Sequence, residues 1–237
     1  MSRAPSFRPL LDERAGGREP SPAAIHKPQD AAGFILAGGQ SSRMGRDKAL
    51  LEFGRRPLIA HALSILHQTG LSASIAGARA DLGSYAPVVA DAAPGLGPLS
   101  GICAALNSTE ARHAVFLPVD VPLIPASLIA ALLFHARTTG QPVTIPSLCG
   151  AVQTFPAVVD RAAVLPALQA ELAAGRRRCR SAFQAACGGA MSVVAVELLV
   201  QAGQVADPRQ LPPSWWFLNA NTPEEMERTI QIGERIT

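Results

Sequence analysis

The chain has 237 residues, of which 48% are hydrophobic and 16% are charged. This balance is typical of a packed globular protein and excludes a wholly disordered chain or a coiled coil. At roughly 100–200 residues per domain, the length allows one large α/β domain with a sizeable core. The formal net charge of +3 is too small for the basic excess that dominates binding to a nucleic-acid backbone, so no nucleic-acid partner is expected.

The cysteines and the apolar stretches indicate where such a protein works. Four cysteines are spread along the chain without a CxxC pair or zinc-ligand spacing, which favours reduced thiols. The N-terminus has no continuous apolar stretch that would serve as a secretory signal. The most apolar stretch, residues 115–134, contains Asp120 and three prolines, so it is not expected to span a membrane. These features predict a cytoplasmic protein that does not bind membranes.

Apolar periodicity predicts the elements of the first half. Residues 1–31 are rich in Pro, Arg, Glu, Gly and Ser, which predicts a flexible N-terminal extension before a single domain at residues 32–237. Strands are expected at residues 33–36, 73–76, 88–90 and 114–117, and helices at 57–68, 98–107 and 126–138. This alternation indicates a largely parallel sheet that is covered by helices.

The second half is less regular. Strand-like runs at residues 143–145, 155–159, 191–197 and 216–219 are interleaved with helical segments at 164–174 and about 180–186, which predicts some antiparallel strands. The sequence Thr222-Pro223-Glu224-Glu225 supplies an N-cap, a proline at the first helical position and a capping-box glutamate. A last helix is therefore expected to begin there.

A glycine-rich segment, AGGQSSRMGRDK at residues 37–48, directly follows the first strand. Its glycines let backbone N–H groups approach an anion closely, and Arg43 and Lys48 add positive charge, so the segment is predicted to bind phosphate. It would lie at the carboxyl end of the sheet, where ligands of α/β proteins bind. The spacing matches neither a Walker A motif, nor GxGxxG, nor a GxSxG nucleophile elbow. A purely structural loop is the alternative.

The longer stretch LAGGQSSRMGRDKALL, residues 36–51, resembles the signature loop of MobA-type molybdenum cofactor guanylyltransferases. The resemblance continues at Asp91 and at residues 94–101, 118–122 and 219–225, and covers about residues 33–233. It implies a Rossmann-like three-layer αβα nucleotidyltransferase fold, with a mostly parallel central sheet and some antiparallel strands in the C-terminal half. It also implies transfer of GMP from GTP to the terminal phosphate of molybdopterin, with or without molybdenum. Pyrophosphate and a guanine dinucleotide form of the cofactor would be the products.

The resemblance and the residues together indicate a nucleotide site. Attack on the α-phosphate of a nucleoside triphosphate gathers negative charge, which cations and a metal stabilise. The expected catalytic residues are Arg43, Lys48 and Asp120, and Asp120 is expected to hold Mg²⁺ at a strand end; a capping role is the alternative. The expected nucleotide-binding residues are Leu36, Ala37, Gly38, Gly39, Lys48, Asp91, Gly97 and Asp120. The Asp91 carboxylate would accept hydrogen bonds from guanine, or would instead cap the following helix.

Residues for the second substrate carry less specific signals. Arg177 and Arg178 belong to the dense basic run at residues 176–180 and are expected either to contact the pterin phosphate or to form a solvated surface. Asn219 and Asn221 would orient the metal or the pterin, or shape the turn before the last helix.

Three short stretches were interpreted less specifically. The family's Gln/His-Pro pair near the pterin site is replaced by Gln153-Thr154-Phe155-Pro156, so recognition of this substrate is expected to differ. Residues 75–78 offer the nucleotide only backbone contacts. The run 215–217, Trp-Trp-Phe, favours strand packing over a stacking platform.

Two other functions remain open. One is a related nucleotidyltransferase that uses CTP or another phosphate acceptor, and the other is a GTP-binding module without turnover. The joint presence of Arg43, Lys48 and Asp120 favours a catalyst, because binding alone seldom needs all three. Beyond the substrates GTP and molybdopterin, the implied partners are molybdenum-insertion proteins and the molybdoenzymes that receive the cofactor.

Overall fold

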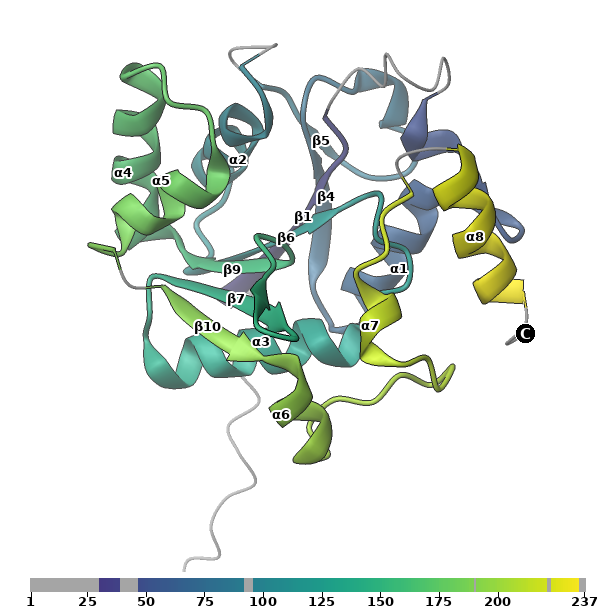
Figure 1. The fold of residues 1–237 in the computed structure, drawn as a ribbon. Helices are drawn as coiled ribbons and strands as arrows, with labels where there is room; N and C mark the ends of the chain where they lie inside the picture. Colours follow the sequence, from purple (N-terminus) through teal and green to yellow (C-terminus); the bar gives the residue numbers. More distant parts are fainter. Residues whose placement is uncertain (1–29, 39–46, 92–95, 190, 221–222, 235–237) are drawn as a thin grey trace, which may run out of the picture.

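The computed structural model describes residues 30–38, 47–91, 96–189, 191–220 and 223–234. Among them, eight strands form one central sheet (Figure 1). The strands are β1 (Ala31–Leu36), β4 (Ser72–Ala76), β5 (Val88–Val89), β6 (His113–Pro118), β7 (Val143–Leu148), β8 (Ala151–Val152), β9 (Ala157–Asp160) and β10 (Ser192–Ala195). Their order is β10-β7-β9-β6-β1-β4-β5, and β8 pairs with β7. Only β8 and β9 of these described strands run antiparallel to their neighbours, which confirms the mostly parallel sheet with antiparallel strands in the C-terminal half.

Helices cover both faces of this sheet (Figure 1). One face packs against α1 (Leu58–Gln68) and α3 (Ala126–Thr139), and the other against α2 (Pro98–Asn107), α4 (Arg161–Ala173) and α5 (Cys179–Ala186). The remaining elements are the short helices η2 (Lys48–Leu50) and η3 (Ala80–Leu82), the hairpin of β2 (Glu52–Phe53) and β3 (Arg56–Pro57), and α6 (Val196–Gln201), α7 (Pro213–Trp216) and α8 (Pro223–Glu234). The three-layer αβα architecture is confirmed.

Neighbouring residues of the central strands point into different cores. Phe34 of β1 stacks on Phe116 of β6 with ring centroids 5.5 Å apart, in the core shared with α2, α4 and α5. Ile35 and Leu117 belong to the opposite core with α1 and α3. Continuous apolar runs are typical of parallel strands that are buried on both faces. The two strands are therefore held firmly, and their carboxyl ends lie side by side, with Leu36 paired to Pro118.

Two predicted strands in the last third of the chain are wrong in part or in full. The run at residues 216–219 is not a strand, because α7 occupies Pro213–Trp216, with a proline in its first turn that favours helix initiation. The bulky aromatic residues suggested a strand, yet Trp216 is buried and its Nε1–H donates to the Leu211 carbonyl at 3.1 Å. The run at 191–197 is a strand only to Ala195, after which α6 begins; its apolar residues fit either element.

The ends of the chain and the cysteines complete the fold. β1 begins at Ala31, and the expected N-terminal extension lies largely outside the described residues, so it stays a prediction. None of the helices in the described ranges is long and apolar enough to cross a membrane. The four cysteines are free. Burial raises the pKa of the Cys103 thiol to about 11 and that of Cys179 to about 12, so both are protonated in the ordinary pH range.

Candidate functional site

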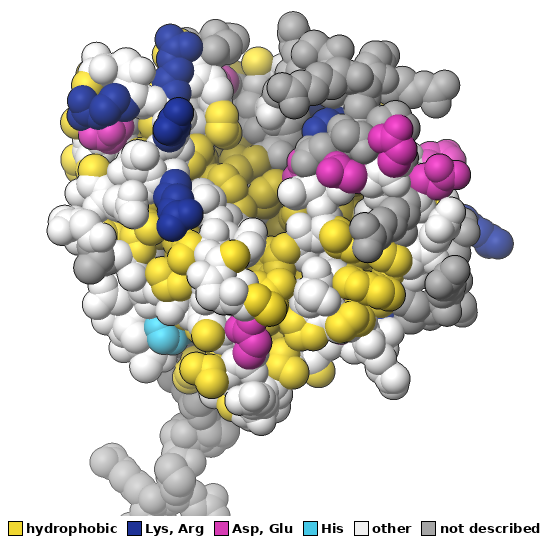
Figure 2. Space-filling view, viewed as in Figure 1, with side chains coloured by type: hydrophobic (Ala, Val, Ile, Leu, Met, Phe, Trp, Pro, Cys, Tyr) yellow, Lys and Arg dark blue, Asp and Glu magenta, His cyan; other side chains and the backbone are white. Residues whose placement is uncertain are grey.

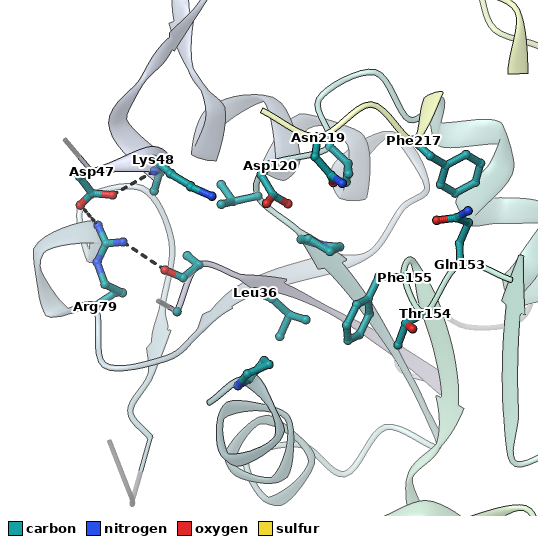
Figure 3. A pocket seen from close by; sticks show the side chains of 17 residues that line it. Leu36, Asp47, Lys48, Arg79, Asp120, Gln153, Thr154, Phe155, Phe217 and Asn219 are labelled. Carbon is teal, nitrogen blue, oxygen red and sulfur yellow. Dashed lines mark hydrogen bonds and ion pairs between the residues drawn. The ribbon is translucent and has the colours of Figure 1, made fainter. Parts of the chain in front are cut away.

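A pocket of about 460 Å³ lies where β1 and β6 end (Figure 3). Parallel strands bring their carboxyl ends to one edge of the sheet, where α/β proteins bind ligands. In Figure 2 the molecule is hollowed between the side that carries α4 and α5 and the side that carries α8, and apolar side chains show inside the hollow. The pocket is lined by Leu36, Ala37, Gly38, Asp47, Lys48, Ala49, Arg79, Pro98, Pro118, Val119, Asp120, Val121, Gln153, Thr154, Phe155, Phe217 and Asn219.

Two opposite charges face each other in this pocket. Lys48 is the first residue of η2, and Asp120 follows β6 by two residues. The Lys48 side chain extends toward the Asp120 carboxylate (Figure 3). Burial raises the pKa of Asp120, and the nearby Lys48 ammonium opposes this effect. A carboxylate that is costly to ionise without a cation, and that faces a pocket beside a cation, is typical of a functional site.

The segment before α8 reaches the same point from the C-terminal part of the chain. The Ala220 N–H donates to the backbone carbonyl of Asp120 at 2.9 Å, which places Asn219 beside Asp120 (Figure 3). The Glu225 carboxylate of α8 also raises the pKa of Asp120. Carboxylate and amide oxygens are the ligands that Mg²⁺ and Ca²⁺ prefer. The Asp120 carboxylate and the Asn219 amide oxygen are therefore two candidate ligands for a hard divalent cation.

Arg79 lines the pocket and was missed by sequence analysis. Its Nη1–H donates to the Ala37 carbonyl at 3.1 Å, and Nη2–H donates to the Asp47 carboxylate. Only backbone contacts were expected from residues 75–78, and Arg79 was not considered. Arg79 reaches the pocket because it follows β4, the strand that pairs with β1, and no pattern in its own segment indicated this position.

The end of the pocket away from Lys48 is aromatic. Phe155 and Phe217 line it together with the polar side chains of Gln153 and Thr154 (Figure 3). Phe155 also packs edge-on against Phe183 of α5, with ring centroids 6.1 Å apart. Sequence analysis favoured packing for the run 215–217; Trp216 does pack in the core, but Phe217 turns to the pocket. This end provides flat apolar surfaces next to amide and hydroxyl groups.

Comparison with known proteins agrees with this geometry. The model of the MobA-like NTP transferase domain matches residues 33–190. A molybdenum cofactor guanylyltransferase of Xanthomonas euvesicatoria is 33% identical over 200 residues, which cover 84% of this chain and 93% of that protein. The chain belongs to the MobA-like NTP transferase family.

Solved structures of low sequence identity share the fold. Molybdopterin-guanine dinucleotide biosynthesis protein A from Archaeoglobus fulgidus superposes with a TM-score of 0.68 at 20% identity, over 86% of this chain and 99% of that one. The 2-C-methyl-D-erythritol 4-phosphate cytidylyltransferase from Thermus thermophilus has a TM-score of 0.61 at 15% identity, over 86% and 98%. The MobA-like chain thus has a nucleotidyltransferase fold, as predicted.

The structure brings together six of the residues that were predicted for the MobA-like site. Those that line the pocket are Leu36, Ala37, Gly38, Lys48, Asp120 and Asn219. Gly39, Arg43 and Asn221 lie outside the described residues. Their roles stay predictions.

Asp91 and Gly97 do not line the pocket. The Ser100 hydroxyl, in the first turn of α2, donates to the Asp91 carboxylate, so Asp91 contacts this helix, but the N-cap position is Gly97. Gly97 precedes α2 with φ +85°, a conformation that favours glycine, and the adjacent Pro98 lines the pocket. Contact of either residue with the nucleotide stays a prediction.

The basic run lies between α4 and α5. Figure 2 shows Lys and Arg side chains gathered over these helices, beside the hollow. Arg176 is paired to Glu171 by two hydrogen bonds of 2.6 and 2.7 Å, whereas Arg177 and Arg178 are exposed and do not line the pocket. Contact between these two arginines and a substrate stays a prediction.

Proposed function

We propose that the chain transfers GMP from GTP to the terminal phosphate of molybdopterin and releases pyrophosphate. An oxygen of the acceptor phosphate bonds to the α-phosphorus of GTP, and the bond between this phosphorus and the oxygen that bridges to the β-phosphate breaks. The observation that carries the proposal is the facing pair of Lys48 and Asp120 at the ends of β1 and β6, in a chain whose relative is a molybdenum cofactor guanylyltransferase.

The residues at the strand ends would bind and orient the triphosphate. The backbone at Ala37 and Gly38 borders the pocket, and Lys48 points into it. The Lys48 ammonium would neutralise charge that gathers on the phosphates as the new bond forms. A fixed cation in a partly enclosed site stabilises such charge better than water does, because it needs no reorganisation. Arg43, which precedes Lys48 in the glycine-rich segment, is proposed to add a second cation.

Asp120 and Asn219 fit a magnesium ion that is shared with the nucleotide. The two side chains supply a carboxylate oxygen and an amide oxygen at the same edge of the pocket. Mg²⁺ is commonly bound by one or two carboxylates together with substrate phosphates and water. A bound magnesium ion would supply positive charge that stabilises the negative charge gathering on the phosphates. Asp120 would hold this ion, and the Asn219 amide would orient it.

The aromatic end of the pocket would receive the second substrate. Phe155 and Phe217 offer faces for a planar pterin ring, and the Gln153 amide and Thr154 hydroxyl offer hydrogen bonds to its ring nitrogens and oxygen. Asn219 lies between this end and Asp120 (Figure 3). The exposed Arg177 and Arg178 would attract the phosphate of the pterin from solution.

The test is pyrophosphate release with Mg²⁺, molybdopterin and each of GTP, CTP, ATP and UTP in turn, with the acceptor omitted as a control. We expect release that requires both GTP and the acceptor, and that is lost in Lys48→Ala. Release with CTP in place of GTP would contradict the guanylyl specificity and favour a related nucleotidyltransferase. Binding of GTP without release would contradict the transfer reaction and favour a binding module.

A further inference from the structure

Arg79 lies in the turn between β4 and η3, and its guanidinium group is shared among three acceptors. Nη1–H donates to the Ala37 carbonyl at 3.1 Å, and Nη2–H to the Asp47 carboxylate. Nε–H and Nη2–H donate to the two carboxylate oxygens of Asp81 at 3.0 and 2.8 Å. The Arg79 side chain is 15% exposed, against 54% for Asp81. Asp81 therefore fixes the guanidinium from the solvent side, and its remaining donors point toward the pocket.

Two of these acceptors, Ala37 and Asp47, lie near the two ends of the glycine-rich segment in the sequence. Ala37 precedes Gly38, and Asp47 precedes Lys48. Asp47 is held twice, because one carboxylate oxygen accepts the Ala49 N–H at 3.0 Å and caps η2 while the other pairs with Arg79. Through Asp47, the guanidinium thus ties the start of η2, where Lys48 stands, to the end of β1.

Backbone packing makes the same connection independently. Gly77, two residues before Arg79, has φ +133°, and a Cβ at this position would lie 3.3 Å from the Gly38 Cα and 3.4 Å from its nitrogen. Both the backbone conformation and the close approach favour glycine. The segment after β4 therefore touches Gly38 through its backbone and Ala37 and Asp47 through the Arg79 side chain.

We propose that Arg79 is a positioning residue for nucleotidyl transfer: it fixes the distance between the end of β1 and Lys48, and so aligns the Lys48 ammonium with the phosphates. The inference rests on the proposed function. Four N–H groups of Arg79 donate to protein acceptors, and two carboxylates balance its charge, so it acts through Asp47 and not as a phosphate ligand. The role needs a planar fork of donors, which lysine lacks although it carries the same charge.

The test compares Arg79→Lys, Asp47→Asn and the double variant in steady-state pyrophosphate release with Mg²⁺, GTP and molybdopterin. The matched control is Arg112→Lys, because Arg112 pairs with Asp160 at 3.0 Å near the start of β6, at the opposite end of the sheet. We expect kcat of Arg79→Lys to fall about 10–100-fold, as for a misplaced catalytic group, with a change in KM for GTP below about threefold. The double variant should be no slower than the slower single variant, because each single variant already removes the contact between Arg79 and Asp47. The control should keep the wild-type kcat.

Several results would overturn this role. Wild-type kcat in Arg79→Lys would do so, as would a loss confined to KM, which would make Arg79 a nucleotide ligand, or losses that multiply in the double variant. If Arg79→Lys does not fold, Asp47→Asn decides by the same criteria, because its amide oxygen still accepts the Ala49 N–H. A wild-type protein that releases no pyrophosphate overturns the proposed function and this role together, whereas an active wild type with an unaffected Arg79→Lys overturns this role alone.

Discussion

Replacing Asp120 by asparagine removes one charge from the centre of the pocket and changes its shape very little. If Asp120 holds the magnesium ion that the nucleotide shares, the loss of its charge removes stabilisation from the transition state. We expect kcat/KM to fall at least about 10²–10³-fold, the range found for the loss of one charge-stabilising group, which corresponds to about 2.7–4 kcal/mol. Pyrophosphate release over a series of Mg²⁺ concentrations measures this loss.

The same change should not destabilise the free protein. Because burial raises the folded-state pKa of Asp120, the unfolded chain loses this proton at a lower pH than the folded one. Stability from the protonated form is therefore present below the unfolded pKa and lost as pH rises through the folded pKa. Near neutral pH the ionised carboxylate is a cost to the fold, which asparagine removes. The substitution also removes the attraction between Asp120 and Lys48. Because both side chains are partly exposed, this attraction contributes only about 0.2–1 kcal/mol to stability. The melting temperature should therefore stay unchanged or rise.

With Mg²⁺ and GTP present, wild type should be more stable than Asp120→Asn. At about 100 times Kd, a ligand that binds only the folded state adds about 2.7 kcal/mol, which for a domain of this size raises the melting temperature by roughly 5–11 °C. Wild type should show such a shift with Mg²⁺ and GTP, and Asp120→Asn should lose the magnesium-dependent part. The control is Asp160→Asn. The Asp160 carboxylate caps α4 by accepting the Ala163 N–H at 3.2 Å, and Asp160 does not line the pocket. An unchanged magnesium-dependent shift in Asp120→Asn, or wild-type kcat/KM, would refute the reasoning.

Two more predictions concern Asp91 and His113. If Asp91 accepts hydrogen bonds from guanine, Asp91→Asn should lower the preference for GTP over CTP by about tenfold or more, as expected for the loss of a hydrogen bond to a charged group. Ser100→Ala should leave the preference unchanged. Competition binding measures both variants, and an unchanged preference in Asp91→Asn would refute the assignment of Asp91 to the base. Burial lowers the pKa of His113 below 6.5, against the attraction of Asp30 at 3.5 Å. The unfolded chain then binds more protons than the folded protein as the pH falls, so stability should fall as the pH falls below about 6.5. His113→Gln should flatten this slope in urea unfolding, and a slope equal to that of wild type would count against the assignment.

Local signals predicted most of the fold. Apolar periodicity predicted a helix at residues 98–107, and α2 begins at Pro98 and ends at Asn107, as predicted. The apolar run at residues 114–117 became β6, which is buried on both faces. Both predictions depend on backbone chemistry and burial within a few residues. α7 was missed because its two tryptophans have the preferences of a strand, while the prolines before them set the backbone.

A pocket residue could be predicted from the sequence only where its neighbours in the chain form a recognisable motif or strand. Lys48 belongs to a motif, and Asp120 follows an apolar strand, so each was identified by its neighbours in sequence. Arg79 and Phe217 have no such context. Arg79 enters the site because β4 pairs with β1, and Phe217 enters because α7 ends beside the pocket. Their roles arise from contacts between segments that are 32 or more residues apart, such as Arg79 with Asp47, and no local pattern encodes such contacts.

The two ends of the pocket are built on different kinds of structure. The end of the pocket that Leu36 and Asp120 line rests on β1 and β6, which are buried between the two cores of the described residues. The aromatic end rests on residues 153–155 and on Phe217, which lie outside helices and strands. Substitutions in turns disturb a core less than substitutions in buried strands. The aromatic end can therefore vary with less effect on the two cores than the end at β1 and β6.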